Sequence, residues 1–286
     1  MAVQDQTLNT TISRDGTEIA YWTSGDGPPL LLIHGSLGDH TRWDALRPHL
    51  EPHVTVHAMD RRGRGGSGDQ AEYSIEREYE DVAAVVDSIA ETSGSLPDVY
   101  CSSYGGVCAF GAAARSLTSN INRLILYEAW PPVDPEVHAL PPGLADRLDA
   151  LLAQGKREEL LETAYLEMVM LTPEELAYIR SQPSWAARIA AAHTVPREGR
   201  WFAATPFDPG QAANIEVPVI LLFGSESSQW RPDVDTVAKA LGGAPVVELE
   251  GQGHGADLLA PDVVARHLVP LLQGRSEGQQ EAAVDR

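Results

Sequence analysis

Cysteine is scarce in this sequence, which has only Cys101 and Cys108 among its 286 residues. The two lie seven positions apart, and the chain contains no C-x-x-C pair or similar metal-ligand spacing. The pattern therefore argues against a disulfide framework and against a structural zinc site. We expect both thiols to be reduced, as in an intracellular protein, and we expect no metal or other cofactor.

We also expect no leader, and the sequence has no long apolar run. Residues 1–11 have no basic start followed by an apolar stretch, as a signal peptide would. No segment reaches the roughly 20 apolar residues that a membrane helix needs. The formal net charge of −20 favours solubility and disfavours nucleic acid and anionic lipid as partners. We expect a cytoplasmic protein with a small-molecule substrate and without nucleic-acid or membrane partners, and a homo-oligomer stays open.

Short apolar runs alternate with helical patterns along most of the chain, whose composition is 43% hydrophobic and 22% charged. Such alternation predicts an α/β fold with a mostly parallel central sheet flanked by helices. An antiparallel hairpin should precede it, because residues 14–16 are turn-forming. The expected strands are 7–13, 17–23, 30–33, 54–59, a strand ending at 100, 124–127, 217–223 and 246–249. The expected helices are 74–91, 104–117, 233–241 and 261–272.

One long segment, residues 130–209, breaks this alternation. It has no convincing strand, several prolines, and helical patches such as those at 144–152, 158–170 and 173–179. We predict an all-helical insertion that acts as a lid over the carboxyl-terminal edge of the sheet. The core domain would then comprise residues 1–129 and 210–274, and the polar residues 275–286 would form a disordered tail.

The strongest functional signal is the segment 98–106, Asp-Val-Tyr-Cys-Ser-Ser-Tyr-Gly-Gly. A strand enters a sharp turn and then a helix of small residues, which is the context that gives a G-x-S-x-G motif its meaning. Residues two positions before and after the nucleophile must be small, because the turn brings strand and helix together. Ser102 would be flanked by two tyrosines, whereas Ser103 is flanked by Cys101 and Gly105. Ser103 is the predicted nucleophile, although such residues can also form a tight turn without catalytic function.

This segment resembles the nucleophile turn of the α/β-hydrolase superfamily, whose usual form is Gly-His-Ser-x-Gly-Gly. The sequence departs from that form by having Cys101 for the first glycine and Ser102 for the histidine. The resemblance implies an α/β-hydrolase fold with an inserted helical lid. Cys101, at the end of a strand, is interpreted as a packing residue and not as a reactive thiol.

A second resemblance lies in the His-Gly-Ser-Leu-Gly run after the first buried strand. It is similar to the loop that supplies one backbone N–H to the superfamily's oxyanion hole. The resemblance implies that the amides of Ser36 and Tyr104 are the oxyanion donors and that Gly35 lets the backbone approach the substrate. His34 is expected to fix the loop by hydrogen bonding.

The glycine- and arginine-rich residues 60–68 resemble a D-x-R-G-x-G-x-S segment of the same superfamily. They lack the Lys-Ser/Thr ending of a phosphate-binding P-loop. We interpret them as a scaffold loop.

Among nine histidines, His254 is the candidate base. It lies in Gly-Gln-Gly-His-Gly, between the last predicted strand and the last predicted helix, and this loop resembles the family's Gly-x-Gly-His loop. The resemblance implies that His254 acts first as general base and then as general acid.

The acid of the triad is ambiguous in the sequence. The position it most often occupies in the family holds Ser227, which cannot supply a negative charge. Glu226 is adjacent to that position, and Glu128 ends the strand 124–127, where Tyr-Glu-Ala resembles the subset of the family whose acid sits one strand earlier. We favour Glu128, keep Glu226 as the alternative, and leave open a Ser-His dyad.

These residues together predict a serine hydrolase that cleaves an ester, lactone or related acyl bond of a small apolar molecule. A serine at this position excludes the dehalogenase and epoxide hydrolase chemistries of the fold, which need a carboxylate there. Four aromatic residues of the predicted lid indicate an apolar pocket, unless they only pack the lid: Trp130, Trp185, Trp201 and Phe202.

Two other functions remain open. The same Ser–His pair could serve an elimination, decarboxylation or other tailoring step of secondary metabolism, as the missing acid at Ser227 and the altered nucleophile turn suggest. A non-catalytic ligand receptor is less favoured, because Ser103 and His254 are both present.

Overall fold

Eight strands form one sheet in the computed structural model, which describes residues 5–134, 136 and 140–274. The strands are ordered β1-β2-β4-β3-β5-β6-β7-β8, and every pair from β4 onward is parallel. β1 and β2 form the expected antiparallel hairpin, and β2 pairs antiparallel with β4. The prediction of a mostly parallel sheet is confirmed. The strands are β1 (Thr7–Ile12), β2 (Glu18–Gly25), β3 (Pro29–Ile33), β4 (Thr55–Met59), β5 (Asp98–Ser102), β6 (Arg123–Tyr127), β7 (Val219–Gly224) and β8 (Val246–Leu249).

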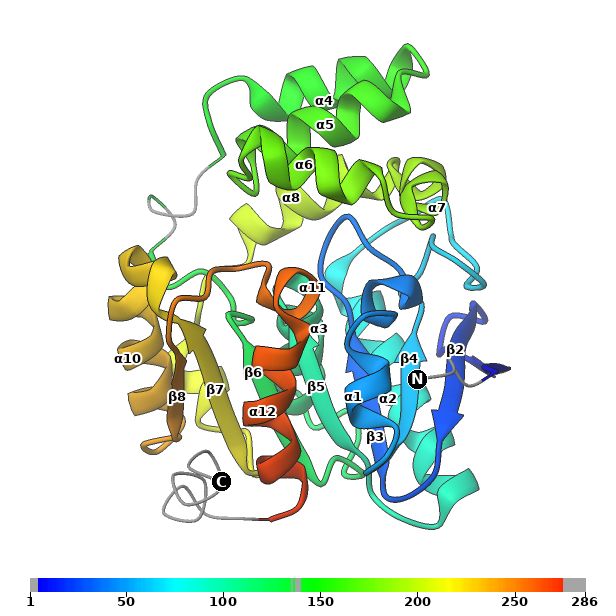
Figure 1. Ribbon diagram of the computed structural model, residues 1–286, viewed down its shortest axis with the longest axis vertical. Helices are drawn as coiled ribbons and strands as arrows, with labels where there is room; N and C mark the ends of the chain where they lie inside the picture. Colours follow the sequence, from blue (N-terminus) through cyan, green and yellow to red (C-terminus); the bar gives the residue numbers. More distant parts are fainter. Residues whose placement is uncertain (1–4, 135, 137–139, 275–286) are drawn as a thin grey trace.

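Helices cover both faces of this sheet (Figure 1). On β3, Leu31 and Ile33 pack into one core with α2, α3 and α10, whereas Leu30 and Leu32 pack into a second core with α1 and α12. A strand buried on both faces needs apolar residues at every position, which is why an unbroken apolar run predicts it. The helices outside the later insertion are η1 (His40–Trp43), α1 (Arg47–Leu50), α2 (Ile75–Ser93), α3 (Tyr104–Ala114), η2 (Ser225–Trp230), α10 (Arg231–Ala240), α11 (Ala256–Leu259) and α12 (Pro261–Leu272).

The segment between β6 and β7 is helical, as expected, and Figure 1 shows its helices α4 to α8 at one end of the sheet. Its helices are α4 (Leu144–Ala153), α5 (Arg157–Glu167), α6 (Pro173–Arg180), α7 (Trp185–Ala191), α8 (Thr194–Ala204) and α9 (Pro209–Ala212). The insertion has its own apolar core, which includes Leu37 from the loop after β3 and Leu258 from α11. It therefore packs on the carboxyl end of the sheet. The sequence did not single out α7 and α8.

The domain boundaries inferred from the sequence stay a prediction. The tail expected at residues 275–286 lies outside the described residues. None of the described helices is long and apolar enough to cross a membrane.

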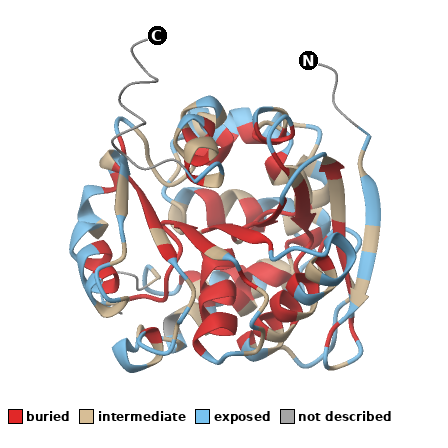
Figure 2. Ribbon diagram, turned by 90° about the horizontal axis from the view of Figure 1, so that it is seen from below, coloured by how far each residue is buried: buried red, intermediate tan, exposed pale blue. Residues whose placement is uncertain are grey.

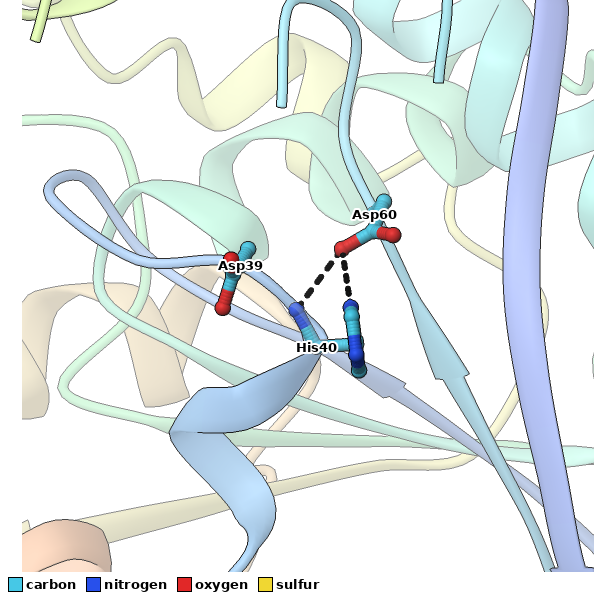
Figure 3. A group of neighbouring side chains, drawn as sticks. All are labelled: Asp39, His40 and Asp60. Carbon is cyan, nitrogen blue, oxygen red and sulfur yellow. Dashed lines mark hydrogen bonds and ion pairs between the residues drawn. The ribbon is translucent and has the colours of Figure 1, made fainter. Parts of the chain in front are cut away.

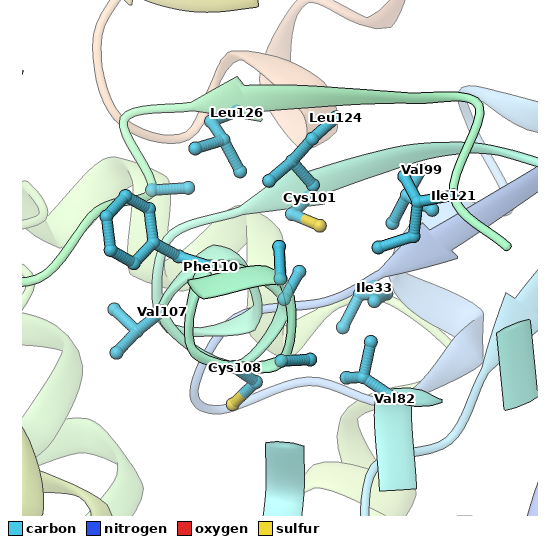
Figure 4. Packing of buried hydrophobic residues seen from close by; sticks show 14 of the residues in the cluster. Ile33, Val82, Val99, Cys101, Val107, Cys108, Phe110, Ile121, Leu124 and Leu126 are labelled. Atoms are coloured by element: carbon cyan, nitrogen blue, oxygen red, sulfur yellow. The ribbon is translucent and has the colours of Figure 1, made fainter. Parts of the chain in front are cut away.

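The centre of the sheet is its most buried part, as the colouring in Figure 2 makes visible. Figure 4 shows Cys101 and Cys108 among aliphatic side chains such as Val99 and Leu124. Both thiols are fully buried, and burial raises the pKa of each well above its ordinary value. A buried thiol that stays protonated is a poor nucleophile, which supports the interpretation of Cys101 as a packing residue.

One buried histidine makes the stability of the fold depend on pH. His57 on β4 accepts or donates one hydrogen bond through Nδ1 to Thr23 Oγ1 at 2.9 Å, and its Nε2 is buried without a partner among the described residues. Burial lowers the pKa of His57 from 6.5 to about 4. Between about pH 6.5 and pH 4, His57 therefore binds a proton in the unfolded chain but not in the folded chain. Folding stability should fall by about 3 kcal/mol as the pH drops through this window.

The His57→Asn variant should lose this part of the acid destabilisation, because its amide does not titrate. Urea unfolding at pH 7 and pH 4.5 measures the difference for wild type and variant. His49→Asn, which alters an exposed histidine, is the matched control and should retain the wild-type pH dependence. Equal pH slopes in wild type and His57→Asn would contradict the assignment.

Candidate active site

Ser103 sits on the sharp turn between β5 and α3, with φ 53° and ψ −130°. A positive φ is strained for a residue other than glycine, and such strain concentrates at functional turns. Gly105 is required next to it, because a Cβ at that position would lie 2.5 Å from the carbonyl oxygens of Ile33 and His34. The small-residue argument that selected Ser103 over Ser102 thus has a direct steric basis at Gly105.

The side chain of Ser103 meets an imidazole from the far end of the chain. His254 Nε2 lies 3.0 Å from Ser103 Oγ, and His254 Nδ1 lies 2.8 Å from Glu128 Oε2. With a neutral imidazole, Nδ1–H donates to the carboxylate and Nε2 accepts from the hydroxyl. This arrangement can remove a proton from Ser103 and stabilise the imidazolium that results.

Glu128 is held rigidly at the end of β6. Its side chain is fully buried, and its Oε1 accepts a hydrogen bond of 2.9 Å from the amide of Gly224. Its own amide donates to the carbonyl oxygen of Leu222. Both contacts come from β7, the neighbouring strand. The carboxylate is therefore oriented by backbone groups and needs no other side chain to aim it at His254.

The loop that carries His254 is tied to the same strands. The hydroxyl of Tyr127 donates to the carbonyl oxygen of Gly253. The amide of Glu226 donates to the carbonyl oxygen of Gln252 at 2.9 Å. Gly224 permits this approach, since a Cβ there would lie 2.3 Å from the Gln252 oxygen.

The alternative acid lies elsewhere. The side chain of Glu226 is exposed, and within the described residues no hydrogen bond or ion pair joins it to His254. Ser227, at the position most often used in the family, is buried on η2. The geometry therefore brings Glu128, and not Glu226, to the imidazole.

Two backbone amides belong to segments that lie beside Ser103. Tyr104 begins α3 directly after Ser103, and the first amides of a helix have no partner within it. Ser36 follows Gly35, whose Cα is so close to the nucleophile that an added Cβ would lie 2.8 Å from Ser103 Cβ. Neither amide is hydrogen-bonded to another residue that the structure describes. Both are thus available as donors beside Ser103.

Comparison with known proteins identifies this architecture. A model of the alpha/beta hydrolase family matches residues 30–267, which is most of the chain. The chain belongs to this family. An alpha/beta hydrolase from Sphaerobacter thermophilus DSM 20745 is 36% identical to it, with a TM-score of 0.77 over 91% of this chain and 98% of the other.

Two further comparisons are more distant. Esterase EaEST from Exiguobacterium antarcticum shares the fold, with a TM-score of 0.71 over 92% of this chain and 98% of the other, at 20% identity. Pyrrolizixenacetamide deacetylase from Xenorhabdus hominickii is 31% identical over 115 residues. That match spans 40% of this α/β hydrolase and 42% of the deacetylase, so it covers less than half of the relative's length.

The loop after β3 in this α/β hydrolase is fixed by His34, as expected. The imidazole Nδ1–H donates to Gly35 O at 2.7 Å, and Nε2 accepts from the amide of Arg61 at 3.2 Å. Burial, reinforced by the positive charges of Arg64 and Arg61, holds the pKa of His34 well below its ordinary value. A neutral ring is what this pair of bonds requires, because one nitrogen must accept.

Asp60 of the scaffold loop lies beside Asp39 and His40, which precede and begin η1 (Figure 3). Among the described residues, these three form the one cluster with metal-ligand composition. Both carboxylate oxygens of Asp60 already accept hydrogen bonds. Asp60 Oδ1 accepts from the amide and Nδ1 of His40, and Asp60 Oδ2 accepts from Trp22 Nε1 and the amide of Gly66.

Burial opposes protonation of His40, but the hydrogen bond and charge of Asp60 outweigh it and raise the pKa of His40. His40 Nδ1 is already used, because it bonds to Asp60 Oδ1 at 2.8 Å. The cluster therefore anchors the loop, and the geometry does not favour it as a metal site.

The four aromatic residues singled out in the sequence pack in different parts of the structure. Trp185 packs on Tyr165 within the insertion, and Trp130 is buried in the main core. Trp201 and Phe202 on α8 contact Tyr73 and Tyr104 of the core domain. Trp230 is not one of these four, and its ring lies edge-on to His254 with centroids 5.1 Å apart. No motif marks it, because only the packing of η2 against the histidine loop brings it there.

Proposed function

We propose that this α/β hydrolase is a serine hydrolase acting on an ester, lactone or related acyl bond of a small apolar molecule. Ser103 is the nucleophile, His254 the general base and acid, Glu128 the orienting acid, and the amides of Ser36 and Tyr104 the oxyanion donors. The observation that carries the proposal is the continuous hydrogen-bonded chain from Ser103 Oγ through His254 to Glu128.

The reaction follows from these contacts. As Ser103 Oγ bonds to the carbonyl carbon, its proton passes to His254 Nε2, and the carbonyl oxygen becomes an oxyanion held by the two amides. Collapse of this intermediate breaks the bond to the leaving group, which takes the proton from His254. Water then attacks the acyl-enzyme, giving its proton to His254, and the acid product leaves as Ser103 regains a proton.

Several features support an apolar substrate and a covering lid. Trp230 beside His254 and Phe202 beside Tyr104 bring aromatic surface close to the proposed reacting groups. The helical insertion contributes Phe202, and we propose that it acts as a lid. The relative named as a deacetylase also cleaves an acyl group, which agrees with this class of reaction.

This geometry gives less support to a non-hydrolytic tailoring step. That alternative rested on the absence of a carboxylate at Ser227 and on the altered turn before Ser103. Glu128 offers His254 the missing carboxylate at 2.8 Å, so a complete triad is the simpler proposal.

A labelling experiment separates these functions. We expect the protein to turn over short p-nitrophenyl esters and to lose that activity in step with addition of a fluorophosphonate to Ser103, located by peptide mass spectrometry. Labelling at Ser103 without ester turnover would favour the lyase or the receptor. Turnover with no label on Ser103 would contradict the assigned nucleophile.

A further inference from the structure

A buried guanidinium lies behind the proposed oxyanion hole. Arg61 is fully buried, and its Nη1 donates to the carbonyl oxygen of Gly35 at 3.2 Å. That carbonyl belongs to the same peptide unit as the amide of Ser36. The guanidinium carbon also lies 4.7 Å from the centre of the Tyr104 ring. One side chain thus contacts the segments that carry both proposed oxyanion donors.

The other side of Arg61 is paired with two carboxylates. Its Nε and Nη2 donate to Glu78 on α2 at 2.8 and 2.6 Å, and Nη2 also donates to Glu198 Oε1 at 2.8 Å. Glu78 belongs to the core domain, whereas Glu198 lies on helix α8 of the insertion. The position of Arg61 therefore depends on a residue that the insertion supplies.

Glu198 is unusual among the acidic residues of the insertion because it is fully buried. Burial opposes its ionisation, but the charges of Arg61 and Arg64 lower its pKa, with a further contribution from the hydroxyl of Ser36. Its Oε2 has no hydrogen bond of ordinary geometry among the described residues. Such a group is expensive to desolvate, and its ion pairs with Arg61 and Arg64 offset part of that cost.

We propose that Glu198 is a positioning residue of the oxyanion hole. When α8 is packed on the core domain, Glu198 fixes the position of Arg61. Arg61 then holds the Gly35 carbonyl, so that the Ser36 amide points at the developing oxyanion. Closure of the insertion and assembly of the hole are then a single event. This inference rests on the proposed function of Ser103 and adds the link between the insertion and the reacting groups.

The test compares two contacts between α8 and the core domain. Glu198→Gln keeps the size of the side chain and removes its charge. The control is Asp69→Asn, since Asp69 receives hydrogen bonds from Arg197 and His193 of the insertion at 2.8 and 3.4 Å, and among the described residues no hydrogen bond joins it to residues 34–36. With a p-nitrophenyl ester, Glu198→Gln should lower kcat by about 10- to 100-fold with KM within about threefold, because a misaimed donor loses part of what a deleted donor loses. Asp69→Asn should keep kcat within about twofold.

A second readout distinguishes positioning from general weakening of the fold. Phosphonylation of Ser103 by a fluorophosphonate also builds charge on an oxygen in the hole, so its rate in Glu198→Gln should fall by the same factor as kcat at a temperature well below Tm. An unchanged kcat in a folded Glu198→Gln protein would overturn the inference. So would an increase in kcat, which would mean that the freed charge of Arg61 acts directly on the oxyanion.

If Glu198→Gln does not fold, Glu198→Asp replaces it. This variant keeps the charge but shortens the arm, so kcat should fall by about threefold or more with KM unchanged, and full kcat would overturn the inference. The failure of the proposed function is separate. It would appear as ester turnover that survives Ser103→Ala, whatever Glu198→Gln does.

Discussion

Ser103→Ala should lower kcat for a short p-nitrophenyl ester by a factor on the order of 10⁵, because the acyl-enzyme cannot form without the hydroxyl. Residual activity should come from binding and from the oxyanion donors alone. KM should change little, since Ser103 Oγ contributes mainly to the transition state. Steady-state kinetics on the purified variant, with thermal unfolding to verify the fold, measure this effect.

The neighbouring serine is the matched control. Ser102 is buried at the end of β5, and its side chain has no hydrogen bond to His254 among the described residues. Ser102→Ala should keep kcat within about tenfold. If instead Ser102→Ala abolishes ester turnover and Ser103→Ala retains it, the steric argument from Gly105 has selected the wrong serine.

Glu128→Gln should lower kcat by about 10³- to 10⁴-fold, because a backbone amide fixes how the glutamine side chain is oriented. The amide of Gly224 donates to Oε1, so the glutamine oxygen must stay there and its NH₂ must face His254 Nδ1. The imidazole is then driven to the tautomer with its proton on Nε2, which cannot accept the proton of Ser103. Kinetics with the same ester measure the loss, and the fold should be retained because the side chain keeps its shape.

Glu226→Gln is the control for this prediction, since that side chain is exposed. It should leave kcat within about twofold. If only Glu226→Gln inactivates the enzyme, the acid has been misassigned. If neither variant loses activity, a Ser-His dyad performs the reaction.

Much of the sheet was predictable because strands buried on both faces leave little room for polar residues. β6, whose last four residues are buried, covers the predicted residues 124–127 and begins one residue earlier. β7 was expected from residue 217 but begins at Val219, because Pro218 has no N–H to give to a neighbouring strand. The nucleophile turn was predictable because packing restricts its residues too, and few residues besides glycine fit at position 105.

The sequence could not identify α8 or its role. Pro196 and Gly199 both have poor helix propensity, although Pro196 falls in the first turn, where proline is tolerated. A glutamate is normally expected at the surface, so nothing local predicts that Glu198 is buried. Its burial depends on pairing with Arg61 and Arg64, which lie more than a hundred residues earlier in the chain.

The choice between the two glutamates also depended on distant parts of the fold. In the sequence, Glu226 is closer than Glu128 to the position most often used by the family. Only the pairing of β6 with β7 and the return of the His254 loop onto β7 bring Glu128 to the imidazole.

The insertion leaves the sheet after β6 and returns to it at β7, and these strands are direct neighbours in the sheet. The two strands are parallel, so β6 ends and β7 begins at opposite edges of the sheet, but the amide of Phe207 donates to the carbonyl oxygen of Pro132 at 2.8 Å. This bond holds the two ends of the insertion together, so exchanging the material between them adds only a small loop-closure entropy. Evolution could therefore replace this segment as a unit, a cassette, and so change which substrates reach Ser103. The strand ends that carry Ser103 and Glu128 would keep their register. A transplanted cassette would succeed fully only if it brought its own carboxylate to Arg61.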